Sequence, residues 1–122
     1  MQTEIKSNML AISSPLAAWL IVLASGFLEV VFSVAMKLSD SYTKLLPGAI
    51  SIVAAVLSVW LMSFTLNILP LGTAYAVWAG VGAAGTALVG IFLFHEPILF
   101  GRLVCIALVV VGIIGLQLQE GG

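Results

Sequence analysis

Glu29 is the residue of this chain whose type and position most clearly indicate chemistry. It is the only acidic residue within four long apolar stretches, and it lies in the first of them. An ionised carboxylate at bilayer depth costs roughly 2.5–3.5 kcal/mol on insertion scales, so such a residue usually marks an ion or proton pathway. The competing interpretation is a protonated carboxyl group that hydrogen-bonds a neighbouring helix. We expect Glu29 to bind a proton and a cation in turn.

Side chains on the same helical face as Glu29 predict a pocket around its carboxylate. On a helix, positions three and four residues away share a face. In this chain those positions are held by Ser25, Gly26, Phe32 and Ser33. In the third apolar stretch, Tyr75 and Trp78 each carry a hydrogen-bond donor that needs a partner when buried, and the carboxylate is the obvious acceptor. The alternative is that both rings belong to an aromatic belt at the membrane edge.

The second apolar stretch carries hydroxyl groups at a seven-residue spacing. They are Ser51, Ser58 and Thr65, and this spacing places them on one stripe of a helix. Hydroxyl stripes of this kind commonly hold membrane helices together. For Ser51 and Thr65 we favour this structural role.

The composition indicates a membrane protein. Of 122 residues, 62% are hydrophobic, whereas soluble globular chains have about 45–50% apolar residues. With a net charge of −1, the chain lacks the basic surface that nucleic-acid binding requires. One cysteine and one histidine leave nothing from which to build a metal cluster or a nucleophile with its base. We therefore expect no metal, no cofactor, no nucleic-acid partner and no enzymatic activity.

Four stretches are each close to the ~20 residues that cross a bilayer as a helix. They cover residues 17–36, 47–65, 73–94 and 99–118. Residues 1–16 form a polar leader that we expect to be mobile, and residues 119–122 form a short tail. The predicted fold is an all-α membrane protein with four transmembrane helices per subunit.

Small residues mark the last two stretches. Gly80 and Gly82 predict a point of bending in the third, because glycines weaken a helix, although close packing would also explain them. The fourth stretch has a seam with alternating four- and three-residue steps, which suits a second helix. The seam consists of Gly101, Cys105, Leu108, Gly112 and Gly115. Four helices barely surround a polar path, so we expect this seam to join two subunits.

The loop charges encode topology weakly. Lys37, Lys44 and Arg102 are expected on one side of the membrane and Lys6 on the other. Because orientation follows the excess of Lys and Arg in short loops, a difference this small gives little preference. Antiparallel pairing of identical subunits is therefore physically allowed.

Two sequence runs carry a resemblance to a known family. The run Gly-Phe-Leu-Glu-Val-Val at residues 26–31, followed by Lys37, and the run PLGTAYAVWAGVG at residues 70–82 resemble the small multidrug resistance transporter family. The resemblance extends over nearly all of residues 17–118. Within the family, the chain is most similar to the guanidinium-exporter branch.

The resemblance implies an antiparallel dimer in the bacterial cytoplasmic membrane that exchanges protons for small organic cations. It implies that Glu29 is the membrane glutamate that binds both. It also implies that Ser58, Tyr75 and Trp78 support this glutamate, because these positions match the supporting serine, tyrosine and tryptophan of the guanidinium branch.

Two departures keep alternatives open. The guanidinium branch usually has tryptophan where this chain has Phe32, which keeps a ring but loses the N–H donor, and the multidrug branch typically has glycine there. The Phe-His-Glu-Pro run at residues 94–97 resembles members that work as two-gene heterodimers. The alternatives are a polyspecific quaternary-ammonium transporter, one subunit of a heterodimer with a paired homologue, and a structural subunit of a larger assembly.

Overall fold

The computed structural model describes residues 14–120, with side chains to residue 119, and this part of the chain forms four helices. They are α2 (Pro15–Leu38), α3 (Leu45–Thr65), α4 (Leu71–Leu93) and α5 (Phe100–Glu120). Each is long and apolar enough to cross a membrane. The expected all-helical architecture with four such helices is confirmed. Most of the expected leader, residues 1–13, lies outside the described residues.

The first helix begins earlier than the expected residue 17, and its start has a local cause. The Ser14 side chain accepts a hydrogen bond from the Ala17 N–H at 3.2 Å and so caps the helix. Pro15 occupies the first turn, where the missing N–H of proline costs nothing. The last helix runs to Glu120, so residues 119 and 120 belong to α5.

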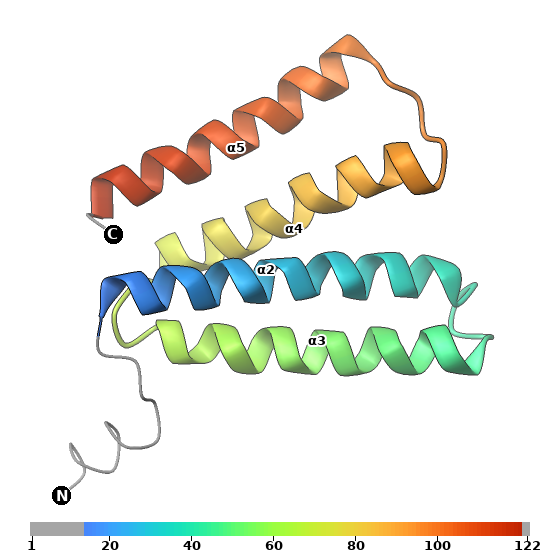
Figure 1. Ribbon diagram of the computed structural model, residues 1–122, viewed down its shortest axis with the longest axis horizontal. Helices are drawn as coiled ribbons and strands as arrows, with labels where there is room; N and C mark the ends of the chain where they lie inside the picture. The colour runs from blue at the N-terminus through green and yellow to red at the C-terminus, as the bar shows by residue number, and fades with distance from the viewer. Residues whose placement is uncertain (1–13, 121–122) are drawn as a thin grey trace, which may run out of the picture.

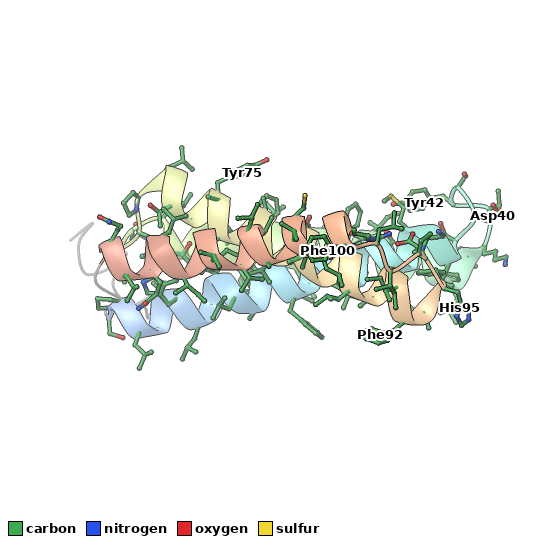
Figure 2. The ribbon with its side chains drawn as sticks, turned by 90° about the horizontal axis from the view of Figure 1, so that it is seen from above. Asp40, Tyr42, Tyr75, Phe92, His95 and Phe100 are labelled. Atoms are coloured by element: carbon green, nitrogen blue, oxygen red, sulfur yellow. The ribbon has the colours of Figure 1, made fainter. Side chains whose placement is uncertain are left out.

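Figure 1 shows how the helices are arranged. α2 and α3 lie side by side and antiparallel, α4 packs on α2, and α5 contacts the rest of the bundle mainly through α4. α3 and α4 contact each other far less than either contacts α2. Asp40 in the α2–α3 loop and His95 in the α4–α5 loop lie at the same end of the bundle (Figure 2). The α2–α3 and α4–α5 loops therefore share one membrane face.

Hydroxyl groups of α3 connect it to the backbone of α2. Ser51 Oγ donates to the Phe32 carbonyl at 3.2 Å, and Ser58 Oγ donates to the Ser25 carbonyl at 2.7 Å. Both serines are fully buried. The helix-joining role expected for Ser51 is confirmed. Thr65 donates to the Met62 carbonyl of its own helix at 2.7 Å instead.

Glycines let α2 and α4 approach closely. A Cβ added at Gly26 would lie 2.7 Å from Val81 Cβ, and one added at Gly85 would lie 2.6 Å from Val30 Cγ2. Gly80 lies against Ile113 of α5. α4 continues as one helix through Gly80 and Gly82, so the contacts support close packing, and the expected bend stays a prediction.

Candidate functional site

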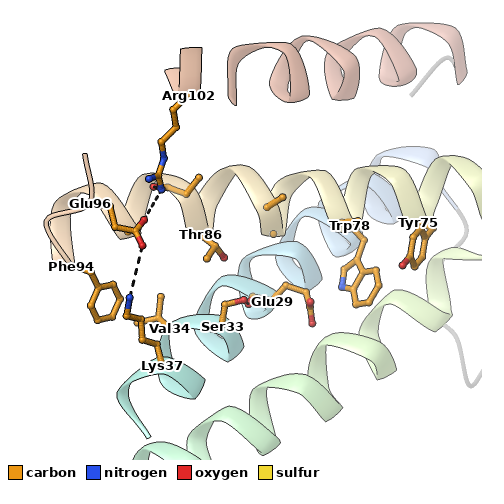
Figure 3. A pocket seen from close by; sticks show the side chains of 15 residues that line it. Glu29, Ser33, Val34, Lys37, Tyr75, Trp78, Thr86, Phe94, Glu96 and Arg102 are labelled. Carbon is orange, nitrogen blue, oxygen red and sulfur yellow. Dashed lines mark hydrogen bonds and ion pairs between the residues drawn. The ribbon is translucent and has the colours of Figure 1, made fainter. Parts of the chain in front are cut away.

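An open cavity of about 510 Å³ lies between α2 and α4 and reaches the start of α5 (Figure 3). Tyr75 and Trp78 of α4 line one end, and Glu96 and Arg102 line the other. Glu29 lies toward the end that Trp78 lines. A single cavity therefore connects the acidic residue of the first span to the charged loop at the membrane face.

Gly82 makes room for Glu29 across the helix interface. The Glu29 side chain points into the cavity toward Trp78 (Figure 3). A Cβ added at Gly82 would lie 2.9 Å from Glu29 Cβ and 3.6 Å from its Cγ. Real side chains do not tolerate such a contact without moving, so a glycine at this position lets the carboxylate keep its place.

Ser58 connects three helices next to Glu29. The Trp78 Nε1–H donates to Ser58 Oγ at 2.7 Å, and Ser58 Oγ donates to the Ser25 carbonyl at 2.7 Å. The Ser58 side chain also interacts with the Glu29 carboxyl group. We expected the indole to donate to the carboxylate directly, whereas the structure places a serine hydroxyl between them.

Tyr75 and Trp78 form an aromatic wall at the Glu29 end. Their ring centroids are 5.4 Å apart and their planes are tilted by 59°. The tyrosine is 55% exposed, so its ring faces the open side of the cavity. Such rings offer π faces to a cation, and each face is worth roughly 0.5–2 kcal/mol.

Of the other residues expected around Glu29, Ser33 lines the cavity, whereas Ser25, Gly26 and Phe32 do not. Ser25 is fully buried, and its Oγ donates to the Val22 carbonyl at 2.8 Å. Gly26 lies against Val81, and Phe32 contributes its carbonyl oxygen to the bond with Ser51. Ser25 and Phe32 accept hydrogen bonds from α3 through their carbonyl groups, and Gly26 contacts α4. A pocket role for the Phe32 ring stays a prediction.

Comparison with known proteins agrees with this geometry. The sequence pattern described as "Small Multidrug Resistance protein" matches residues 17–109. The chain belongs to the small multidrug resistance family. It is 44% identical over 103 residues to a protein named "Guanidinium exporter" from Yersinia pestis, covering 84% of this chain and 99% of that one. A protein of the same name from Salmonella typhimurium is 44% identical over 102 residues, covering 84% and 97%.

The far end of the cavity in this small multidrug resistance protein holds three charged side chains. Arg102 Nη2 lies 2.5 Å from Glu96 Oε1, and Lys37 Nζ lies 3.9 Å from Glu96 Oε2. The Lys37 ammonium also lies 4.6 Å from the centroid of the Phe94 ring. The hydrogen bond from Arg102, with the nearby positive charges of Arg102 and Lys37, holds the pKa of Glu96 below its usual range.

From the sequence, Glu96 was considered only as part of the Phe-His-Glu-Pro run, and Arg102 only as a positive charge on one side of the membrane. The available signal was the spacing of these two residues across the loop between the last two spans. That spacing does not reveal that the loop folds back onto α4. The loop does so because the Glu96 N–H donates to the Gly90 carbonyl at 3.1 Å, with His95 in a left-handed conformation at φ 55°.

The expected subunit seam lies on the outer side of the chain. Gly101, Cys105, Leu108, Gly112 and Gly115 are all exposed. No atom of the described chain would lie within 4 Å of a Cβ added at any of the three glycines. The seam is therefore accessible for contact with another molecule of the family.

Proposed function

We propose that this protein is a proton-coupled antiporter, and not an enzyme, that exports guanidinium or small guanidinium-like cations. The observation that carries the proposal is the position of Glu29, inside an open cavity and beside Ser58 and the ring of Trp78. The two relatives named as guanidinium exporters, each 44% identical over most of the chain, support the substrate class.

The chemistry of the site suits a guanidinium ion. This cation is planar and presents paired N–H groups that match the two oxygens of a carboxylate. The rings of Trp78 and Tyr75 supply apolar faces beside that carboxylate. Glu29 therefore binds the N–H edge of the cation, and the rings contact its face.

Ser58 can hydrogen-bond Glu29 in both the protonated and the deprotonated state of the glutamate, which allows Glu29 to exchange a proton. Its single O–H is donated to the Ser25 carbonyl, and one oxygen lone pair accepts the Trp78 N–H. The second lone pair can accept a hydrogen bond from the O–H of a neutral Glu29. When Glu29 loses its proton, the Ser58 O–H can turn from the carbonyl to the carboxylate. One carboxylate cannot hold a proton and a cation together, and this exclusion couples their opposed movements.

We further propose that the functional unit is an antiparallel dimer in the bacterial cytoplasmic membrane. The exposed seam on α5 and the open side of the cavity support a second subunit. The small excess of Lys and Arg on one side supports insertion in both orientations. The partner is a second copy of the chain or a paired homologue.

A second candidate is the export of larger quaternary ammonium ions. The size of the cavity favours it, because about 510 Å³ falls within the range of sites that bind drug-sized ligands. Such ions lack N–H groups, so they would use the aromatic wall without the paired hydrogen bonds to Glu29.

Current recordings on solid-supported membranes test these alternatives. The full chain is reconstituted alone in liposomes and exposed to guanidinium, guanylurea and tetraalkylammonium ions, with Glu29→Gln as the control. We expect currents with guanidinium and its relatives in the wild type and none in the control. Currents with tetraalkylammonium alone would favour the second candidate. If the chain is silent without a second gene product, the homodimer is wrong.

A further inference from the structure

Arg102 places a guanidinium group of the protein itself inside the cavity. Its Nη2 lies 2.5 Å from Glu96 Oε1 and donates to the Ala87 carbonyl at 3.3 Å. The Arg102 and Glu96 side chains are 29% and 35% exposed, so the pair lies at the opening and is reachable from water. The Glu96 carboxylate (Figure 3) and the Ala87 carbonyl therefore already bind a guanidinium.

The position of the Glu96 carboxylate is set by the backbone and not only by Arg102. The Glu96 N–H donates to the Gly90 carbonyl at 3.1 Å, which folds the loop onto the end of α4. The carboxylate then lies against Gly90, where an added Cβ would collide with Glu96 Oε1. The binding group is consequently held in place whether or not Arg102 is bound to it.

The surroundings of Glu96 resemble those of Glu29 in kind. An aromatic ring, Phe94, accommodates the ammonium group of Lys37 at 4.6 Å from its centroid. The ring and both carboxylates line the same cavity. Each end of the cavity thus combines a carboxylate with an aromatic face, which are the groups that recognise a planar cation.

Thr86 lines the cavity between the two acidic residues (Figure 3). Its Oγ1 is buried and has no hydrogen-bond partner among the described residues. A buried hydroxyl without a partner is uncommon and calls for an explanation. A cation that moves between Glu96 and Glu29 would pass Thr86, and a turn of this side chain toward the cavity would let the hydroxyl oxygen accept a hydrogen bond from it.

We propose that Glu96 and the Ala87 carbonyl form a second binding site for guanidinium-type cations at the mouth of the cavity. Arg102 occupies this site in the structure, and a substrate cation takes its place when the arginine side chain swings away. One positive group replaces another, so the exchange leaves the charge beside Glu96 unchanged. This inference rests on the proposed function, because it assigns the substrate of Glu29 to a second position.

Equilibrium binding of radiolabelled guanidinium to the purified full chain in nanodiscs tests the mouth site. The background is Glu29→Gln, which removes the inner site. Adding Arg102→Gln should uncover the mouth site and tighten binding by roughly tenfold or more, the usual worth of hydrogen bonds to charged groups. Adding Glu96→Gln to that double variant should abolish the gain. Binding that is unchanged in the double variant, or that survives the loss of Glu96, would overturn the proposal.

A second measurement applies if the double variant fails to fold. Arg102→Lys, in an otherwise native chain, keeps a cation at the mouth but lacks the planar fork that matches a carboxylate. The lysine side chain should compete less strongly than arginine with guanidinium for Glu96, so the KM for guanidinium in proteoliposomes should fall. A merely structural role for Arg102 predicts an equal or higher KM, and that result would contradict the mouth site.

These outcomes separate the two proposals. If wild-type chain transports no guanidinium, or Glu29→Gln transports it undiminished, the proposed function itself fails. If both of those controls behave as expected but Arg102 substitution has neither effect, only the mouth site fails.

Discussion

Trp78 on α4 donates its indole N–H to Ser58 on α3 at 2.7 Å, and this bond joins two helices that otherwise contact each other little. Ser58 is fully buried and is bonded at the same time to the α2 backbone. The three helices therefore meet at one hydroxyl group, next to the carboxylate that we propose binds the substrate.

We expect Ser58→Ala to impair transport more than a simple loss of packing would. The change leaves the buried Trp78 N–H without its acceptor, at a cost of roughly 1–3 kcal/mol. It also removes the hydroxyl that interacts with Glu29. Proton-driven guanidinium uptake and tryptophan fluorescence would both report the change. Ser51→Ala is the matched control, because it removes a hydroxyl bond to α2 away from Glu29. Equal effects of the two variants would contradict a special role for Ser58.

Glu29→Gln should abolish proton-coupled transport while leaving the protein folded, because an amide cannot exchange a proton near neutral pH. Uptake into proteoliposomes driven by a pH gradient measures the coupling, and circular dichroism checks the fold. Glu29→Asp should retain partial coupling with a shifted pH optimum, since the carboxylate survives but its reach changes. Undiminished uptake by the glutamine variant would refute the mechanism.

Gly82→Ala should weaken guanidinium binding. The new methyl group would lie 2.9 Å from Glu29 Cβ, so the glutamate side chain or α4 must shift. Overpacking of this kind typically costs about 1–3 kcal/mol. The comparison is Gly72→Ala, where an added Cβ would meet no atom within 4 Å. Isothermal titration with guanidinium should show reduced affinity for the first variant and little change for the second.

Gly112→Leu should weaken dimerisation if the α5 seam joins two subunits, because close helix contact requires small residues. Val110→Leu serves as control, since residues two apart on a helix lie on roughly opposite sides. Crosslinking yield in membranes measures both. A yield equal to wild type for Gly112→Leu would indicate that the seam faces lipid.

The ion pairs of Glu96 with Arg102 and Lys37 should stabilise the fold at neutral pH and lose this effect in acid. The pKa of Glu96 is lowered from the ordinary 4.5 by the hydrogen bond from Arg102 and by the positive charges of Arg102 and Lys37. A group with a lowered folded-state pKa stabilises the fold above its unfolded value and loses that effect as pH falls through the folded value. Melting of wild type and Glu96→Gln should therefore differ at pH 7 and converge in acid below pH 4.5. A difference that grows toward acid pH would be the wrong sign.

The sequence was sufficient to predict the four helices, the exceptional position of Glu29 and, through the family resemblance, the involvement of Ser58, Tyr75 and Trp78. Helices follow from apolar length alone, and a lone acid in lipid stands out without any structure. The indole–serine bond was not predicted. It depends on how α3 and α4 are placed around α2, and glycine contacts such as Gly26 with Val81 determine how closely α4 approaches α2.

The ion pairs of Glu96 with Arg102 and Lys37 at the cavity opening were not predicted either, for a different reason. Glu96 reaches Arg102 only because a left-handed residue, His95, turns the loop back onto Gly90. Histidine adopts that conformation more often than most residues, but still in only a small share of cases, so the local sequence gives little warning of it. Helical spacing predicted the ring of Phe32 near Glu29. Spacing shows which residues share a face of a helix, but not which neighbouring helix covers that face, so a pocket role for this ring stays a prediction.

The extensive contact between α2 and α3 bears on how the chain is made. These helices are adjacent in sequence, and their two serine-to-backbone bonds need nothing from later segments. The hairpin can therefore pair in the bilayer while the ribosome is still synthesising the second half. α5 emerges last and contacts the finished part mainly through α4. Its seam faces away from the other three helices, which leave it open for contact with a neighbouring molecule.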